Sequence, residues 1–128
     1  MPQYTDALRG YAFSIMRRDR FKCRYCGFDG RESFANWLCL SWDHLLPNDH
    51  PQRDDPRFIV TSCRFCNEAD NQYFRLAKKR GLKFNGLSPE ALVAQRKRYV
   101  DVTRQAYHSF WVENVTQSGQ GSTRESHA

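Results

Sequence analysis

The spacing of apolar residues near the start of the chain is that of a helix. Five of them lie one, three or four positions apart: Leu8, Tyr11, Ala12, Ile15 and Met16. This spacing places apolar side chains on one face of a helix. Asp6 suits the start of such a helix, and the arginines that follow Met16 suit its end, where the helix dipole favours positive charge. The pattern predicts a helix from Ala7 to Arg20.

Two short runs in the middle of the chain are rich in aromatic and β-branched residues. The first runs from Trp37 to Trp42 and is followed by Asp43 and His44, and the second runs from Phe58 to Thr61. Runs of this composition are typical of strands. The polar segment from Asn48 to Pro56 lies between them. We therefore expect two strands joined by a long loop.

Helical periodicity returns in the second half of the chain. A helix is expected from Cys66 to about Arg80, where Gly81 suits its end. Ser88 followed by Pro89 is a strong helix start, because serine caps the free backbone N–H groups and proline suits the first turn. The apolar periodicity that follows reaches Trp111. The pattern predicts a long last helix.

The end of the chain differs in composition from the rest. Residues 117–128 are small and polar and have no apolar periodicity, which is typical of a disordered tail. The preceding residues, 1–116, are enough for one domain with a modest core. Because helices and strands are both expected there, the predicted fold class is α+β.

Charge and hydropathy narrow the choice of partner. The chain has 128 residues and a formal net charge of +6, which favours an anionic partner. Nucleic acid is the leading candidate, although a small basic protein can also simply be soluble. The sequence lacks both a long apolar run and the apolar stretch of a signal peptide. We therefore expect a cytoplasmic protein that does not associate with a membrane.

Four of the five cysteines form two pairs with identical spacing. Cys23 and Cys26 make the first pair, and Cys63 and Cys66 make the second. In a reducing compartment such pairs favour a metal over disulfides, and four thiolates suit tetrahedral Zn²⁺ with no open position. The pattern predicts a structural zinc site. Cys39 lies in an apolar stretch and is expected to be a small core residue.

Other residues with chemical potential lie close to these cysteines. Asp43, His44 and Pro47 form the motif Asp-His-x-x-Pro between the two pairs, and Asn67 directly follows the second pair. This order resembles the zinc-stapled branch of the HNH endonucleases, which are built on a ββα-metal finger. The resemblance covers about residues 21–74. It implies a ββα-metal finger here, flanked by an N-terminal helix and a long C-terminal helix.

The resemblance also implies an activity and the residues that perform it. It implies a metal-dependent endonuclease that hydrolyses phosphodiester bonds in DNA, with His44 as the general base. Asp43 and Asn67 match the family's ligands for one catalytic Mg²⁺ or Mn²⁺, and hard oxygen ligands suit these ions. The expected partner is double-stranded DNA. A homodimer or a partner subunit would allow both strands to be cut.

Two features of the motif depart from the simplest assignment. Phe58 occupies the position of the family's middle asparagine, so His44 would have to be oriented by packing, by a backbone carbonyl or by a side chain such as Asn48. Asp70 and Asn71 share a helical face with Asn67 and could compete with it as ligands of the catalytic ion. The amide directly after the cysteine pair is preferred because it matches the motif.

Basic residues near the motif are candidates for phosphate contacts. The first group consists of Arg64, Lys78, Lys79 and Arg80, and a second group, residues 96–98, lies in the last helix. Two other functions remain open at this point. One is a non-catalytic zinc-finger module that binds nucleic acid. The other is a protein-interaction domain that uses the aromatic residues of the last helix.

Overall fold

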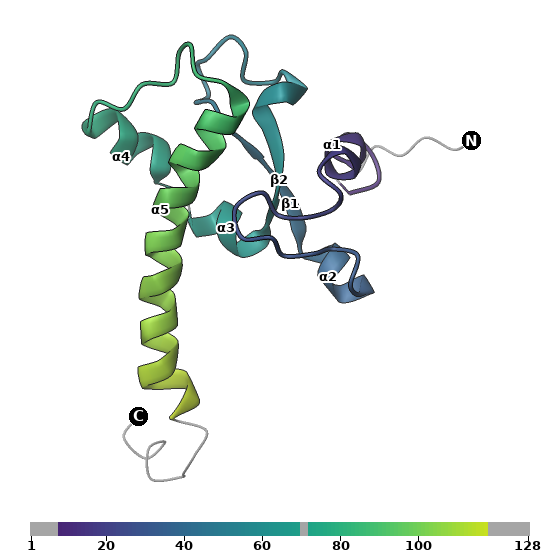
Figure 1. Ribbon diagram of the computed structural model, residues 1–128, viewed down its shortest axis with the longest axis vertical. Coiled ribbons are helices and arrows are strands. Elements are labelled where there is room, and N and C mark those ends of the chain that lie inside the picture. The colour runs from purple at the N-terminus through teal and green to yellow at the C-terminus, as the bar shows by residue number, and fades with distance from the viewer. Residues whose placement is uncertain (1–7, 70–71, 118–128) are drawn as a thin grey trace.

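The computed structural model describes residues 8–69 and 72–117 and has an α+β fold (Figure 1). In chain order the main elements are α1 (Phe13–Arg18), α2 (Phe34–Leu38), β1 (Leu40–His44), β2 (Ile59–Cys63), α3 (Arg64–Ala69), α4 (Tyr73–Lys79) and α5 (Pro89–Phe110). A 3-10 turn, Pro56–Phe58, precedes β2, and Trp111–Thr116 continues α5 in π-helical form. The predicted fold class is confirmed at this coarse level.

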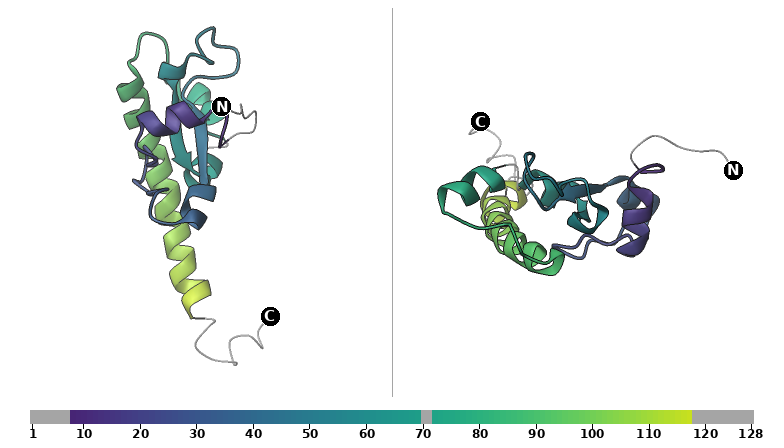
Figure 2. Two further views of the ribbon diagram at one scale, coloured as in Figure 1. Left: turned by 90° about the vertical axis from the view of Figure 1, so that its right-hand side faces the viewer. Right: turned by 90° about the horizontal axis from the view of Figure 1, so that it is seen from above.

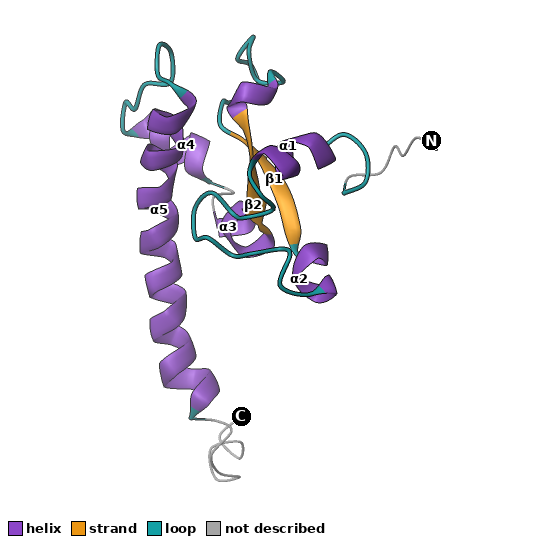
Figure 3. Ribbon diagram, turned by 45° about the vertical axis from the view of Figure 1, so that its right-hand side comes forward, coloured by secondary structure: helices purple, strands orange, loops and turns teal. Residues whose placement is uncertain are grey.

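The two strands form an antiparallel hairpin at the centre of the molecule (Figure 3). The register pairs Leu40 with Cys63 at one end and His44 with Ile59 at the other. The chain enters α3 directly after β2, so Cys63 is the last strand residue and Arg64 the first helical one. Figures 1 and 2 show α5 on one side of the hairpin and α1 on the other.

Two apolar clusters hold these layers together. The larger cluster joins three of the paired cysteines, Cys23, Cys63 and Cys66, to the hairpin and to α5, and its α5 members are Leu92, Val93 and Val100. The smaller cluster joins α1 to β1 through Ala12, Met16 and Leu40. Burial of this apolar surface is the main force that fixes α1 and α5 on the hairpin.

Asp19, just after α1, connects that helix to β2 through polar contacts. Its carboxylate accepts a hydrogen bond from the backbone N–H of Thr61 at 2.9 Å and forms ion pairs with Arg18 and Arg24. Burial alone would raise the pKa of Asp19, but the bonds from Arg18 and Thr61 outweigh it and lower the pKa. The Asp19 carboxylate that connects α1 to β2 is therefore ionised.

The first predicted strand is partly wrong. Residues 34–38 form the short helix α2, and the strand begins only at Leu40. Ser33 explains the difference, because its Oγ caps the helix by accepting a hydrogen bond from the N–H of Asn36 at 3.0 Å. The aromatic composition of the run concealed this start signal. Cys39 ends α2 and is exposed, so its expected place in the core is also wrong.

The second predicted strand is shifted, and two predicted helices have different bounds. β2 runs from Ile59 to Cys63, and Phe58 belongs to the 3-10 turn before it. The first helix covers only Phe13–Arg18, and its predicted start at residues 6–7 lies outside the described residues. The single helix expected up to Arg80 is two helices, α3 and α4, because Gln72 before α4 has non-helical angles (φ −107°, ψ 8°).

The prediction for the last helix is confirmed at its start. Ser88 Oγ accepts a hydrogen bond from the N–H of Ala91 at 3.1 Å, and Pro89 is the first residue of α5. The buried residues of α5 end at Val100, and Figure 1 shows the rest of the helix projecting beyond the body of the molecule. The expected tail from residue 118 onward lies outside the described residues. Among the described helices, none is long and apolar enough to cross a membrane.

Candidate metal centre and adjoining cavity

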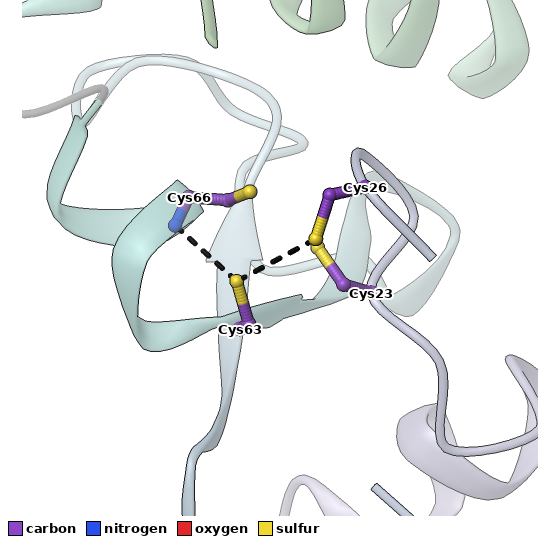
Figure 4. A group of neighbouring side chains, drawn as sticks. All are labelled: Cys23, Cys26, Cys63 and Cys66. Atoms are coloured by element: carbon purple, nitrogen blue, oxygen red, sulfur yellow. Dashed lines mark hydrogen bonds between the residues drawn. The ribbon is translucent and has the colours of Figure 1, made fainter. Parts of the chain in front are cut away.

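The two cysteine pairs meet in space, as the sequence predicts. The sulfur atoms of Cys23, Cys26, Cys63 and Cys66 all lie within 4.8 Å of one another (Figure 4). The first pair lies in a tight turn between α1 and α2, and the second pair spans the junction of β2 and α3. This cluster could therefore hold one metal ion such as zinc.

Local backbone geometry shapes the turn of the first pair. Gly27 has a φ of +78°, which glycine adopts without steric cost, and its N–H donates to the carbonyl of Cys23 at 2.9 Å. Backbone N–H groups also approach the sulfurs: that of Tyr25 lies 3.4 Å from Cys23 Sγ, and that of Cys66 lies 3.5 Å from Cys63 Sγ. Such contacts favour thiolates, the form that binds a metal.

One sulfur–sulfur distance matches that of a zinc site, and two of the four sulfurs have lowered pKa values. A tetrahedral site with Zn–S bonds of about 2.3 Å has sulfur–sulfur edges of about 3.8 Å, and the Cys26 and Cys63 sulfurs are 3.8 Å apart. Hydrogen bonds within the cluster lower the pKa of Cys26 to about 6 and also lower that of Cys63. They raise the pKa values of Cys23 and Cys66. A metal that binds here would displace the protons of these last two thiols.

One cation lies against the cluster. Arg104 of α5 donates from its guanidinium to Cys66 Sγ at 3.2 Å, and the same group lies 4.7 Å from the ring centroid of Phe65. A Zn²⁺ ion with four thiolates carries a net charge of −2, so a neighbouring guanidinium offsets part of this charge. Arg104 therefore links the projecting helix to the metal centre.

The three residues that the motif singled out line one cavity. Asp43 and His44 end β1, and Asn67 lies on α3, yet all three border the same cavity of about 390 Å³. Neighbouring residues of a strand normally face opposite sides. Here the strand ends at His44, so both side chains can reach this cavity. The remaining residues around it are Ser41, Trp42, Arg53, Glu68 and Phe74.

Asp43 is buried and paired. Its Oδ2 accepts a hydrogen bond from the Tyr25 hydroxyl at 2.7 Å and another from the guanidinium of Arg96 at 2.5 Å. Arg96 is only 1% exposed, and its guanidinium lies 4.6 and 4.5 Å from the ring centroids of Tyr73 and Phe74. The ion pair fixes the carboxylate in one orientation. Arg96 had been a candidate for phosphate contact, and its burial shows that this expectation is wrong.

His44 is half-buried at the end of the strand. Its Nε2 lies 3.6 Å from Asp54 Oδ1, so the neighbouring group is Asp54 and not Asn48. Burial lowers the pKa of His44, and the positive charge of Arg53 lowers it further. Phe58 is buried, and its backbone carbonyl accepts the N–H of Leu45 at 2.8 Å. These features favour a neutral imidazole held at the edge of the cavity.

Asn67 is oriented by β1. Its Nδ2 donates to Ser41 Oγ at 3.1 Å, which leaves the amide oxygen as the atom suited to bind a cation. The alternative ligands considered from the sequence, Asp70 and Asn71, lie outside the described residues. Among the described residues, Asn67 is the amide that borders the same cavity as Asp43 and His44.

Arg53 and Glu68 border the cavity but carry no sequence signal. Arg53 Nε is buried and has no hydrogen-bond partner among the described residues, while a second guanidinium nitrogen lies 3.3 Å from Asp54 Oδ1. A buried donor of this kind suits an anionic ligand in the cavity. Arg53 lies in the loop between the strands, where no motif marks it. Only the folded loop brings it to His44.

The predicted cationic group is divided in space. Arg64 is exposed at the start of α3 and borders a groove that also contains Asn67. Lys78, Lys79 and Arg80 are exposed at the end of α4 and border neither this groove nor the cavity of Asp43 and His44. Of the four residues, Arg64 is therefore the one that lies beside the motif.

The cavity contains oxygen donors that suit a hard divalent ion, although one oxygen of Asp43 already accepts two hydrogen bonds. Asp43 and Asn67 offer oxygen atoms to the same space, and Glu68 adds a carboxylate at its edge. Such donors suit Mg²⁺ or Mn²⁺. Because Tyr25 and Arg96 already donate to Asp43 Oδ2, an ion would have to use the other carboxylate oxygen or displace one of these donors.

Comparison with known proteins yields no relatives. No protein-family model matches the chain, and no curated protein or solved structure matches it. The cysteine cluster, the cavity of Asp43, His44 and Asn67, and the motif that contains them are the features that point to a function.

Proposed function

We propose that this protein is a metal-dependent endonuclease of the HNH type, with a ββα-metal finger formed by β1, β2 and α3. It would hydrolyse phosphodiester bonds in DNA. A structural zinc ion would be held by the cluster of Cys23, Cys26, Cys63 and Cys66. The catalytic residues would be those of the adjoining cavity.

One observation carries the proposal. Asp43, His44 and Asn67 come from two elements, and the motif assigns all three to one catalytic site. They border a single cavity, and Asn67 directly follows Cys66 of the cysteine cluster on α3. The motif predicts that these three residues lie together, and their shared cavity agrees with that prediction.

Each residue has a role that its surroundings favour. His44 is held neutral by its lowered pKa and can take a proton from an attacking water molecule. Arg53 can donate from its unpartnered Nε to a phosphate oxygen. Tyr25 and Arg96 keep the carboxylate of Asp43 in place. Phe58, at the position of the family's amide, is buried in the larger apolar cluster and cannot form a side-chain hydrogen bond.

Asp43 and Asn67 are the residues that would hold the catalytic ion. When bound, Mg²⁺ or Mn²⁺ would neutralise charge on the phosphate and on the departing oxygen. The bond from Asn67 Nδ2 to Ser41 Oγ supports this role, because it leaves the amide oxygen available to a cation.

Cleavage of supercoiled plasmid by the zinc-loaded protein tests the proposal. The parent, His44→Ala and the matched control His108→Ala are compared with Mg²⁺, with Mn²⁺ and without added divalent ion. His108 is exposed on the last helix, so its replacement should leave activity unchanged. We expect nicking by the parent and the control only with added ion. Loss of a general base should lower the rate of His44→Ala by at least about a hundredfold.

The outcome that contradicts the proposal is equally concrete. If His44→Ala nicks plasmid as fast as the parent at equal zinc content, the cavity is not the catalytic site. If the parent cuts nothing with any ion but still binds DNA, the second candidate applies.

That second candidate is a non-catalytic zinc-finger module that binds nucleic acid. The pairing of Asp43 Oδ2 with buried Arg96 favours it, because the pair already satisfies the charge that a metal would otherwise balance. Phe58 in place of the family's amide points the same way. Such a module would bind nucleic acid without Mg²⁺ or Mn²⁺, and His44→Ala would leave binding unchanged.

A further inference from the structure

A second hollow adjoins the proposed catalytic cavity. It is a groove of about 570 Å³ between α2, β1 and α3, with Leu40 and Trp42 on the strand and Trp37 on α2. The volume is in the range of sites that hold a small organic ligand. We call it the tryptophan groove. Its residues come from both apolar and charged positions of the sequence.

The walls of the tryptophan groove combine aromatic faces with positive charge. Trp37 is half-buried and stacks on exposed Phe34, with ring centroids 6.2 Å apart and an angle of 27° between the rings. Trp42 is also half-buried, and Arg64 and Arg9 border the groove. A nucleobase presents a flat aromatic face and is linked to an anionic phosphate. The groove offers a surface for each of these parts.

The tryptophan groove and the catalytic cavity are neighbours. Ser41, Trp42, Asn67 and Glu68 border both hollows. A strand whose phosphate lies beside Asn67 would therefore have the groove next to it. The next nucleotide of such a strand would meet Trp42 at the boundary and Trp37 further along.

A paired duplex cannot use such a groove without losing a base pair, because its bases are stacked inside the helix. The placement of the cations agrees with this, since Lys78, Lys79 and Arg80 border neither hollow. Within the described residues, Arg9, Arg53 and Arg64 are the cations that border the two hollows.

We infer that the tryptophan groove binds an unpaired nucleobase next to the scissile phosphate, so that the substrate is single-stranded or locally unpaired nucleic acid. This inference rests on the proposed function and replaces the duplex expected from the sequence. Supercoiled plasmid remains a fitting substrate for the nicking assay, because negative supercoiling favours local opening of the duplex.

Binding without cleavage tests the inference separately from catalysis. The zinc-loaded protein is titrated with labelled oligothymidylate and with a fully paired duplex of the same length, in buffer without Mg²⁺ or Mn²⁺. Trp37→Leu keeps the apolar contact but removes the stacking surface, and Trp111→Leu on the projecting helix is the matched control. We expect the parent and the control to prefer the single strand. Trp37→Leu should bind it at least about fivefold more weakly, because base stacking on an aromatic side chain contributes substantially to affinity.

A second measurement uses tryptophan fluorescence and leaves the residues of the tryptophan groove unsubstituted. Trp111→Phe leaves Trp37 and Trp42 as the only tryptophans of the chain, and the single strand should quench their fluorescence while the duplex does not. Equal or tighter binding of duplex, unchanged affinity in a folded Trp37→Leu, or no quenching would each overturn the inference. If the protein nevertheless cleaves duplex DNA in the presence of Mg²⁺ or Mn²⁺, the proposed nuclease function is retained and only the inference about the groove is rejected. Single-strand binding without cleavage would support the groove and reject the nuclease.

Discussion

At the scale of single residues, the site depends on how its charges are held. Asp43 is fixed by Tyr25 and Arg96, and His44 is kept neutral by burial and by Arg53. The sequence motif names Asp43 and His44 but gives no indication of the residues that hold them. Arg96 lies 53 positions after its partner, and no local pattern connects two residues so far apart.

The lowered pKa of His44 predicts a pH dependence of cleavage. Only neutral His44 can accept a proton, so the rate should rise with pH through its pKa and reach half its maximum below the ordinary value of 6.5. Arg53→Gln removes a positive charge that lowers this pKa, so the midpoint should move upward. The pH–rate profiles of the two proteins, measured with saturating Mn²⁺, check this. An unchanged midpoint in Arg53→Gln would show that another group titrates.

The buried pair of Asp43 and Arg96 predicts a large effect on stability. Arg96→Met removes the cation and leaves a buried carboxylate unpaired, which typically costs about 3–5 kcal/mol. Arg98→Met, an exposed position on the same helix, is the control and should change stability by less than about 0.5 kcal/mol. Urea denaturation of the zinc-loaded proteins measures both. A loss of less than about 1 kcal/mol in Arg96→Met would mean that the pair is dispensable.

At the scale of secondary-structure elements, the hairpin and α3 form the frame of the site. Cys63 ends β2, Cys66 lies in α3, and both are buried in the larger apolar cluster. A metal at these sulfurs would therefore fix the angle between strand and helix, and with it the distance between His44 and Asn67. α5 supports the frame from outside through Arg96 and Arg104.

Arg104 provides a test of this support from α5. Arg104→Met keeps much of the aliphatic packing but removes the charge beside Cys66, so the thiolates should hold zinc less tightly. Replacing a residue that hydrogen-bonds a metal ligand typically weakens metal affinity by about tenfold or more. The rate of zinc transfer to a coloured chelator measures the effect, with Arg98→Met as the control. Equal rates in the two variants would show that Arg104 does not stabilise the centre.

The elements also show which local signals could be recognised in advance. Two C-x-x-C spacings predicted the cluster, and Ser88 with Pro89 predicted the start of α5, because each signal is contained within a few residues. The helix at residues 34–38 was missed because its aromatic residues suggested a strand, whereas Ser33 supplied the cap. No proline or glycine lies between α3 and α4 in the sequence to mark the end of one helix and the start of the next. Tertiary packing, which a local pattern does not contain, decides such positions.

At the scale of the whole molecule, the sequence predicted which residues meet but not what surrounds them. The cysteine cluster and the shared cavity of Asp43, His44 and Asn67 follow from a motif with fixed order. The tryptophan groove could not be expected, because Trp37 and Trp42 belong to different elements. The net charge of +6 did not indicate where the cations lie: Arg53 and Arg64 each border one of the two hollows, whereas Lys78, Lys79 and Arg80 border neither.

The most direct test of the account does not require the substrate. Binding of Mn²⁺ to the zinc-loaded protein is measured by electron paramagnetic resonance for the parent, Asn67→Ala and His44→Ala. Saturating the cysteine cluster with zinc restricts Mn²⁺ to the cavity. The account predicts one bound Mn²⁺ in the parent, unchanged binding in His44→Ala, and a loss of affinity of at least about tenfold in Asn67→Ala. No specific binding by the parent, or equal binding by folded Asn67→Ala, would contradict the proposed catalytic site.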